Sequence, residues 1–328
     1  MATTTRGPAR PRTPRRAVHG VLVLDKELGV SSNGALQHAK RLYRAEKAGH
    51  TGTLDPLASG VLPLCFGAAT KFAQASLDAD KRYLATLRFG VTTTTGDLEG
   101  DIVATVADVA VARSDLERVC AKLAGETMQV PPMHSALKHE GKPLYAYARA
   151  GVDVERAPRR VRVDAIRVVD GGGDRWTVEI ACSKGTYVRT LAEDLGAALG
   201  CGAHLEALRR TGSGALDVRD AVRLADLEAI ANEAARDRLL RSPDVLLADS
   251  PSITLASDDA ARFLTGLRRR VDSADAALVR VYGPEPDAFL GTGHVRAGEL
   301  IASRLLSPDE VGALLARRRM PSRESLPA

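Results

Sequence analysis

The chain has 328 residues, of which 45% are hydrophobic and 27% are charged. These proportions are typical of a globular protein with a sizeable core, and the length allows one large domain or a large domain with a small one. No apolar stretch is long enough to cross a bilayer and no hydrophobic signal region follows the basic N-terminus, so we expect a cytoplasmic protein.

The net charge of +5 is concentrated in the two tails. Residues 1–16 contain five arginines and no acid, and residues 317–324 contain four arginines and one glutamate. Removing these nine basic residues and one acid from the totals of 46 and 41 leaves 37 and 40, so the body of the chain is close to neutral. Basic tails can hold RNA, but solvated disorder is the commoner reason for such compositions. Charge alone therefore does not establish a nucleic-acid partner.

The first predicted elements alternate between strand and helix. Residues 1–17 are expected to form a disordered basic arm. Residues 19–26 predict a buried strand ending at Lys26, and a serine at position 31 or 32 can cap a helix over residues 35–43. Residues 83–89 alternate apolar with polar side chains, which predicts a second strand.

The later elements mix hairpins with helices. Residues 161–169 and 176–181 predict two strands joined by a glycine turn, and helices are expected over 114–124, 188–199 and about 226–240. Beyond Pro251, short β segments indicate a small β-rich domain to about residue 306, followed by a flexible tail over 307–328. Because hairpin turns occur among the strands, we expect an α+β fold rather than a doubly wound sheet.

The segment Gly49–Gly60 presents one carboxylate, Asp55, directly before Pro56. A residue before proline avoids helical geometry and proline cannot donate to a strand ladder, so Asp55 is expected on a constrained loop. An ordinary Asp-Pro turn, in which the carboxylate bonds its own backbone, is the commoner interpretation. A functional role requires partner residues elsewhere in the chain.

Tyr83 and Arg189 are the candidate partners. Tyr83 shares the apolar face of its strand, which favours core packing, and its functional alternative is to stack against a nucleobase. Arg189 falls in the first turn of a predicted helix, where a cation opposes the helix dipole unless an anion faces it. If Asp55 is that anion, Arg189 would hold it ionised and lower its pKa. A solvent-exposed arginine is the alternative.

Five segments resemble the TruB family of tRNA pseudouridine synthases in their order and spacing. They lie within residues 19–215 and are Gly49–Gly60, Lys81–Tyr83, Val130–Tyr145, Cys182–Thr190 and Gly202–Arg210. The resemblance implies a catalytic domain over residues 18–250 with a mixed, mainly antiparallel sheet. It also implies an RNA-binding insert at about 125–152 and a small PUA-like RNA-binding domain over 251–306.

The same resemblance implies an isomerase that converts uridine 55 in the T loop of tRNA to pseudouridine without a metal or an organic cofactor. The family's catalytic aspartate corresponds to Asp55, its stacking tyrosine to Tyr83 and its carboxylate-binding arginine to Arg189. The other matched positions contact the substrate RNA or adjoin the active-site strand, and they are His50, Tyr187, Leu208 and Lys26.

Two departures from the family pattern concern Glu27, where proline is frequent, and His134, where tyrosine is frequent. Two further functions stay open: a non-catalytic tRNA-binding or tRNA-folding protein, and a guide-dependent pseudouridine synthase within a ribonucleoprotein. The joint presence of Asp55, Tyr83 and Arg189 favours an enzyme, and the large insert favours the stand-alone type. We expect tRNA as the partner, no obligatory protein partner and a monomer.

Overall fold

The computed structural model describes residues 14–285 and 288–318. Its helices are α1 (Ser32–Leu42), α2 (Ala73–Asp78), α3 (Arg113–Leu123), α4 (Leu144–Arg149), α5 (Val188–Ala198), α6 (Leu224–Ala229), α7 (Glu233–Asp237), α8 (Ser257–Leu264) and α9 (Pro308–Arg318), with 3-10 turns η1 (Gly67–Phe72), η2 (Val218–Asp220) and η3 (Pro243–Leu247). Within these described ranges, no helix is long and apolar enough to cross a membrane.

The strands of the main sheet are β1 (Gly20–Lys26), β2 (Ala48–His50), β3 (Ala58–Phe66), β4 (Lys81–Phe89), β7 (Gly125–Gln129), β10 (Arg159–Gly172), β11 (Arg175–Cys182), β12 (Ala203–Ser213), β13 (Leu216–Asp217) and β14 (Val222–Arg223). Their order is β14-β1-β3-β12-β4-β11-β10-β7, with β2 beside β3 and β13 beside β12. Only the β1–β14 and β3–β12 pairs are parallel among the described strands of this sheet. The prediction of an α+β fold with a mixed, mainly antiparallel sheet is confirmed.

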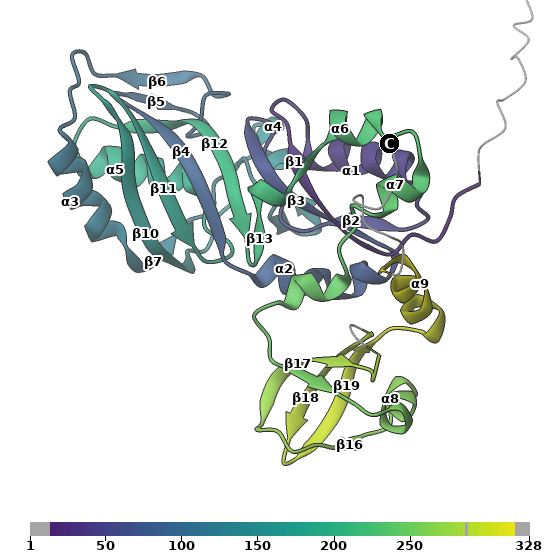
Figure 1. Cartoon of the computed structure of the whole chain (residues 1–328). Helices are drawn as coiled ribbons and strands as arrows, with labels where there is room; N and C mark the ends of the chain where they lie inside the picture. The colour runs from purple at the N-terminus through teal and green to yellow at the C-terminus, as the bar shows by residue number, and fades with distance from the viewer. Residues whose placement is uncertain (1–13, 286–287, 319–328) are drawn as a thin grey trace, which may run out of the picture.

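Helices cover the sheet in separate groups (Figure 1). One core joins α3 and α5 to β4, β10, β11 and β12, and includes Leu116, Leu191, Leu87 and Val178. A second core lies between α1, α6 and strands β1 and β3. Two hairpins, β5 (Val91–Thr93) with β6 (Ile102–Thr105) and β8 (Lys138–His139) with β9 (Lys142–Pro143), stand apart from the main sheet.

The expected β-rich character of the C-terminal part is also confirmed. A second sheet has the order β15-β17-β18-β19-β16, from β15 (Ser252–Thr254), β16 (Arg269–Arg270), β17 (Ala276–Tyr282), β18 (Phe289–Arg296) and β19 (Glu299–Leu305). This sheet packs on the rest of the chain, since the rings of Phe289 and Phe72 lie 5.1 Å apart. The Tyr282 hydroxyl also donates to the Asp244 carboxylate at 2.8 Å.

The prediction of a flexible tail over 307–328 is wrong for residues 308–318, which form α9. Leu314 is buried in the core beneath η1 and η3, and burial of a leucine contributes about 1.5–3 kcal/mol. The Lys71 ammonium and the Glu310 carboxylate form an ion pair at 2.6 Å, which fixes the start of the helix. The helix is therefore part of the folded body, and residues 319–328 lie outside the described residues.

Two other sequence expectations need correction. Residues 1–13 of the predicted arm lie outside the described residues, but Arg16 is anchored because its guanidinium donates to both oxygens of Asp237 at 2.7 and 2.6 Å. The single helix expected over 226–240 is two short helices, α6 and α7. The break follows from Ile230, which is extended, and from Asn232, whose side chain caps α7.

Candidate active site

The loop that carries Asp55 connects β2 to β3, and two glycines are required by the backbone, one in the loop and one near the start of β3. Gly52 and Gly60 have φ values of +75° and +101°, which side-chain-bearing residues rarely adopt. A Cβ atom on Gly60 would also lie 2.2 Å from the carbonyl oxygen of Arg210 in β12. The loop therefore passes close to β12 only because these positions are glycine.

The first turn of α1 holds the same loop in place. The Ser32 hydroxyl accepts a hydrogen bond from the Leu54 amide at 2.8 Å and donates one to the Leu54 carbonyl at 2.9 Å. In the segment just before α1, the Gly29 amide donates to the Pro56 carbonyl at 2.8 Å. Both residues flanking Asp55 are thus fixed by backbone hydrogen bonds, so the carboxylate is presented on a rigid support.

We expect Ser32→Ala to destabilise the protein by about 1–3 kcal/mol, because the buried Leu54 amide and carbonyl would lose their partner. Urea denaturation of the two proteins measures this difference. The exposed Ser273 provides a matched control, and Ser273→Ala should change stability by less than about 0.5 kcal/mol. Equal midpoints for the wild type and Ser32→Ala would contradict the bracing role of Ser32.

Arg189 is the second residue of α5 and is buried, so the interpretation as a solvent-exposed arginine is wrong. Its Nη2 atom lies 3.0 Å from Oδ2 of Asp55, and its Nη1 atom lies 3.3 Å from Oδ2 of Asp97. The guanidinium also donates to the backbone carbonyls of His134 at 2.7 Å and Thr95 at 3.3 Å. One buried cation therefore links the Asp55 loop, the insert and the turn after β5.

Asp97 is a site residue that sequence reasoning missed. Its side chain is 3% exposed, and it accepts hydrogen bonds from the Thr95 hydroxyl and from the Glu99 amide. The sequence signal that could have pointed to Asp97 is the glycine directly before it. Gly96 adopts a positive φ of +69°, which forms a tight turn at Asp97. A buried carboxylate needs a charge partner, and Arg189 is the cation that supplies it.

The pKa of Asp55 is raised above its ordinary value, contrary to the sequence expectation. Burial against the neighbouring elements is the largest cause, and the attraction of Arg189 opposes it without reversing the direction. Asp97 adds to the rise because a second negative charge lies nearby. The Asp55–Arg189 pairing was predicted correctly, but its net effect on the pKa was not.

A cavity of about 280 Å³ opens in front of this pair. It is close to the lower end of ligand-pocket volumes, about 300 Å³, and so suits a single small group such as one nucleobase. Five of the sequence-predicted residues line it together: Asp55, Tyr83, Tyr187, Arg189 and Leu208.

Tyr83 faces the cavity while its other side packs against the core. Across the β12–β4 pair it lies opposite Arg210, a fully buried arginine that also lines the cavity and that sequence reasoning did not assign to the site. Arg210 also donates to the Val61 carbonyl at 2.7 Å and to the Gly52 carbonyl at 2.9 Å. Burial raises the pKa of Tyr83, so the ring is a neutral surface at physiological pH. Arg210 thus ties that surface to the Asp55 loop.

Tyr187 caps the N-terminus of α5 and is held by Gln129 at the end of β7. The Gln129 amide oxygen accepts from the Tyr187 backbone amide at 2.7 Å, and its nitrogen donates to the Tyr187 carbonyl at 3.1 Å. The part of the insert that follows β7 supplies Ser135, Ala136 and Leu137 to the cavity wall. The insert therefore adjoins the cavity directly.

Lys26 and His50 are both described, and both lie outside the cavity lining. Lys26 is fully buried, and its ammonium donates to the carbonyls of Glu27 at 2.9 Å and Val30 at 2.7 Å. Burial lowers the pKa of Lys26 to about 8, and attraction to Asp55 opposes that change. Burial also lowers the pKa of His50. Lys26 thus holds the segment after β1 and interacts with Asp55 by charge.

No cluster of three or more His, Cys, Asp or Glu side chains suited to a metal ion occurs in residues 14–285 and 288–318. The site's polar groups are two carboxylates, a guanidinium and backbone carbonyls. Such a set can hold an ionised carboxylate beside a flat apolar surface. It can therefore support nucleophilic or general-base chemistry at a group that enters the cavity.

Comparison with protein families gives matches along most of the chain. The model of the TruB family pseudouridylate synthase N-terminal domain matches residues 40–188. The model of the tRNA pseudouridylate synthase B C-terminal domain matches residues 189–248. The model described as pseudouridine synthase II TruB, C-terminal, matches residues 251–306.

Two curated relatives are each 54% identical to the chain. A tRNA pseudouridine synthase B of Verminephrobacter eiseniae aligns over 94% of this chain and 95% of its own length. The protein of the same name from Cupriavidus pinatubonensis aligns over 90% and 96%.

Solved structures share the fold at lower identity. A complex of Cbf5, Nop10 and Gar1 matches with a TM-score of 0.68 and 25% identity over 89% of this chain and 87% of that one. An H/ACA ribonucleoprotein bound to a substrate RNA containing 2′-deoxyuridine matches with a TM-score of 0.68 and 22% identity over 89% and 86%.

Proposed function

The chain belongs to the TruB family of pseudouridylate synthases, and from this premise we propose that it isomerises uridine 55 in the T loop of tRNA to pseudouridine. The single observation that carries the proposal is the Asp55–Arg189 pair at 3.0 Å beside a cavity of about 280 Å³ lined by Tyr83. The reaction breaks the N1–C1′ bond, rotates the uracil and forms a C5–C1′ bond. It involves no net oxidation and no hydrolysis.

Asp55 is the proposed catalytic residue. Its carboxylate can attack C1′ of the ribose or remove a proton from C2′, and both routes require the ionised form. Arg189 favours that form by its positive charge and, through its bonds to Asp97 and His134, fixes the direction of the carboxylate. Burial works against ionisation and raises the pKa of Asp55, so the two effects together leave a more basic aspartate than usual.

Tyr83, Tyr187 and Leu208 are the proposed contacts to the flipped nucleotide. Extrusion of a base from its stack costs a few kcal/mol, and stacking on an aromatic ring returns about 1–3 kcal/mol. Lys26 and His50 are proposed to act from behind the loop rather than by direct contact. The insert at 125–152 and the C-terminal β-rich part are proposed to bind the remainder of the RNA.

The proposal is tested by incubating the purified full chain with an unmodified tRNA transcript and mapping pseudouridine. We expect modification at the T-loop uridine without added guide RNA or protein. Absence of product at that position, with the transcript correctly folded, would overturn the proposed function.

As the pH is lowered, activity should be lost at a higher pH than it would be if Asp55 had the ordinary pKa of an aspartate. Because burial raises the pKa of Asp55 and the reaction needs its ionised form, protonation removes activity as the pH drops through that raised value. The acidic limb of kcat/KM should therefore lie above about pH 3.9, the ordinary value for aspartate. A pH–rate profile measures it, and a limb at or below that value would contradict the effect of burial.

Two observations favour a stand-alone enzyme over the two alternatives, a guide-dependent pseudouridine synthase and a protein that only binds or folds tRNA. Relatives named tRNA pseudouridine synthase B are 54% identical across nearly their whole length, whereas the Cbf5-containing complex is 25% identical. A protein that only binds or folds tRNA would not need an ionised carboxylate paired to a buried arginine at a base-sized cavity. The chain is proposed to act on tRNA as a cytoplasmic enzyme that requires no partner protein.

A further inference from the structure

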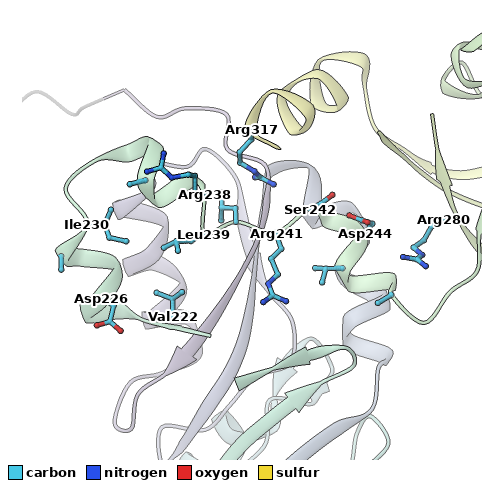
Figure 2. A pocket seen from close by; sticks show the side chains of 15 residues that line it. Val222, Asp226, Ile230, Arg238, Leu239, Arg241, Ser242, Asp244, Arg280 and Arg317 are labelled. Carbon is cyan, nitrogen blue, oxygen red and sulfur yellow. The ribbon is translucent and has the colours of Figure 1, made fainter. Parts of the chain in front are cut away.

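A second and larger groove lies at the β14 edge of the main sheet, apart from the cavity at Asp55. Its volume is about 1200 Å³, and it is bounded by α6, the segment after α7, η3, β17 and α9. Figure 2 shows that the labelled arginines around it come from three parts of the chain: Arg238 and Arg241 from the segment between α7 and η3, Arg280 from β17, and Arg317 from α9. None of them takes part in the proposed reaction.

The positive charge of this groove is only partly matched by acids. Arg280 donates to two neutral oxygens, the Ser250 carbonyl at 3.0 Å and the Tyr282 hydroxyl at 3.4 Å. Arg241 lies 3.3 Å from the Asp220 carboxylate, but both side chains are more than a third exposed, so the pair is weak and exchangeable. Arg238 is exposed, and within the described residues no ion pair or hydrogen bond of its guanidinium is found.

The two carboxylates in the lining already have other partners. Asp226 is bound by the Arg223 guanidinium through two hydrogen bonds at 2.8 and 2.9 Å. Asp244 accepts from the Tyr282 hydroxyl at 2.8 Å. The groove therefore presents an excess of guanidinium groups to an incoming ligand.

One described arginine from each basic end of the chain lies at or beside this groove. Arg16 donates to both carboxylate oxygens of Asp237 in α7, and Asp237 directly precedes Arg238. Arg317 begins the C-terminal arginine run and donates to the His19 carbonyl at the start of β1. Arg16 and Arg317, which lie near opposite ends of the sequence, are thus brought close to the same groove.

We propose that this groove binds the phosphodiester backbone of the tRNA substrate at a point separate from the flipped uridine. The inference rests on the proposed function for the identity of the RNA. Guanidinium groups from several elements match a repeating phosphate backbone, which they contact without reading the base sequence. A groove of about 1200 Å³ is far larger than one phosphate ion requires.

The test is equilibrium binding of an unmodified tRNA transcript to the full chain at several salt concentrations. Each phosphate contact contributes about 0.7–0.9 to the slope of log affinity against log salt. We expect Arg238→Gln and Arg241→Gln each to weaken binding several-fold near 0.1 M salt and to reduce the slope by about that amount. Arg238→Lys, which keeps the charge, should retain most of the affinity.

Arg118→Gln is the matched control, because Arg118 is an exposed arginine on α3, at the far end of the molecule from the groove (Figure 1). Unchanged affinity and slope in both groove variants would overturn the proposal, and so would an equal loss in Arg118→Gln. Affinity for the transcript is read out separately from pseudouridine formation, so failure of the wild type to form pseudouridine would overturn the proposed function alone.

Discussion

Asp55→Asn should reduce pseudouridine formation by about 10³-fold or more while tRNA binding stays largely unchanged. Asparagine has nearly the same shape as aspartate, so it can occupy the loop between Leu54 and Pro56 without disturbing their hydrogen bonds. It is neither a nucleophile nor a general base, and such groups supply rate factors of that size. Single-turnover conversion of a tRNA transcript, with a separate binding titration, measures both quantities.

The matched control is Asp115→Asn, which removes an exposed carboxylate on α3 that pairs only with a neighbouring exposed arginine. This variant should convert tRNA at the wild-type rate. Substantial turnover by Asp55→Asn would show that another group performs the chemistry. Loss of binding together with turnover would instead indicate that Asp55 supports the RNA contact rather than the reaction.

Arg189→Met should destabilise the protein by about 3–5 kcal/mol and also reduce activity. Asp97 is 3% exposed, so removal of Arg189 would leave a buried carboxylate without its cation, and such changes carry costs of this size. Asp55 is 42% exposed and can be solvated, so it contributes less to the loss of stability. Urea denaturation of the wild type and the variant measures the difference.

The same variant has a second signature in the pH dependence of catalysis. Arg189 lowers the pKa of Asp55, so its removal should raise that pKa further and move the acidic limb of kcat/KM to higher pH. Adding Asp97→Asn to Arg189→Met should recover part of the stability, because the uncompensated charge is removed. Arg118→Met is the control, with an expected change below about 0.5 kcal/mol. An unchanged unfolding midpoint in Arg189→Met would contradict the buried-pair interpretation.

Local sequence patterns placed the three central residues correctly. Asp55 lies on a loop because of Pro56 and the surrounding glycines, Tyr83 lies on β4, and Arg189 lies in the first turn of α5. Each of these placements depends on neighbours within a few positions, through proline sterics, a period of two or a period of 3.6. The resemblance to the TruB family then connected the segments that carry them.

Sequence reasoning failed where distant segments meet. Asp97 is 92 positions from Arg189, and no local pattern indicates that the two form an ion pair at 3.3 Å. The docking of α9 likewise depends on Lys71, which lies 239 positions before its partner Glu310. Such contacts are set by the packing of whole elements, which a local pattern does not encode.

The sequence by itself therefore determined that a loop carries Asp55, that Tyr83 lies on a strand and that Arg189 lies in the first turn of a helix. Only the tertiary structure decided the direction in which the pKa of Asp55 is shifted, because the partial burial of its side chain depends on the elements that surround the loop and outweighs the pairing with Arg189. The same reason applies to the charged tails. Their composition is visible in the sequence, but the placement of Arg16 against α7 and of Arg317 against the start of β1 follows from the packing of these elements.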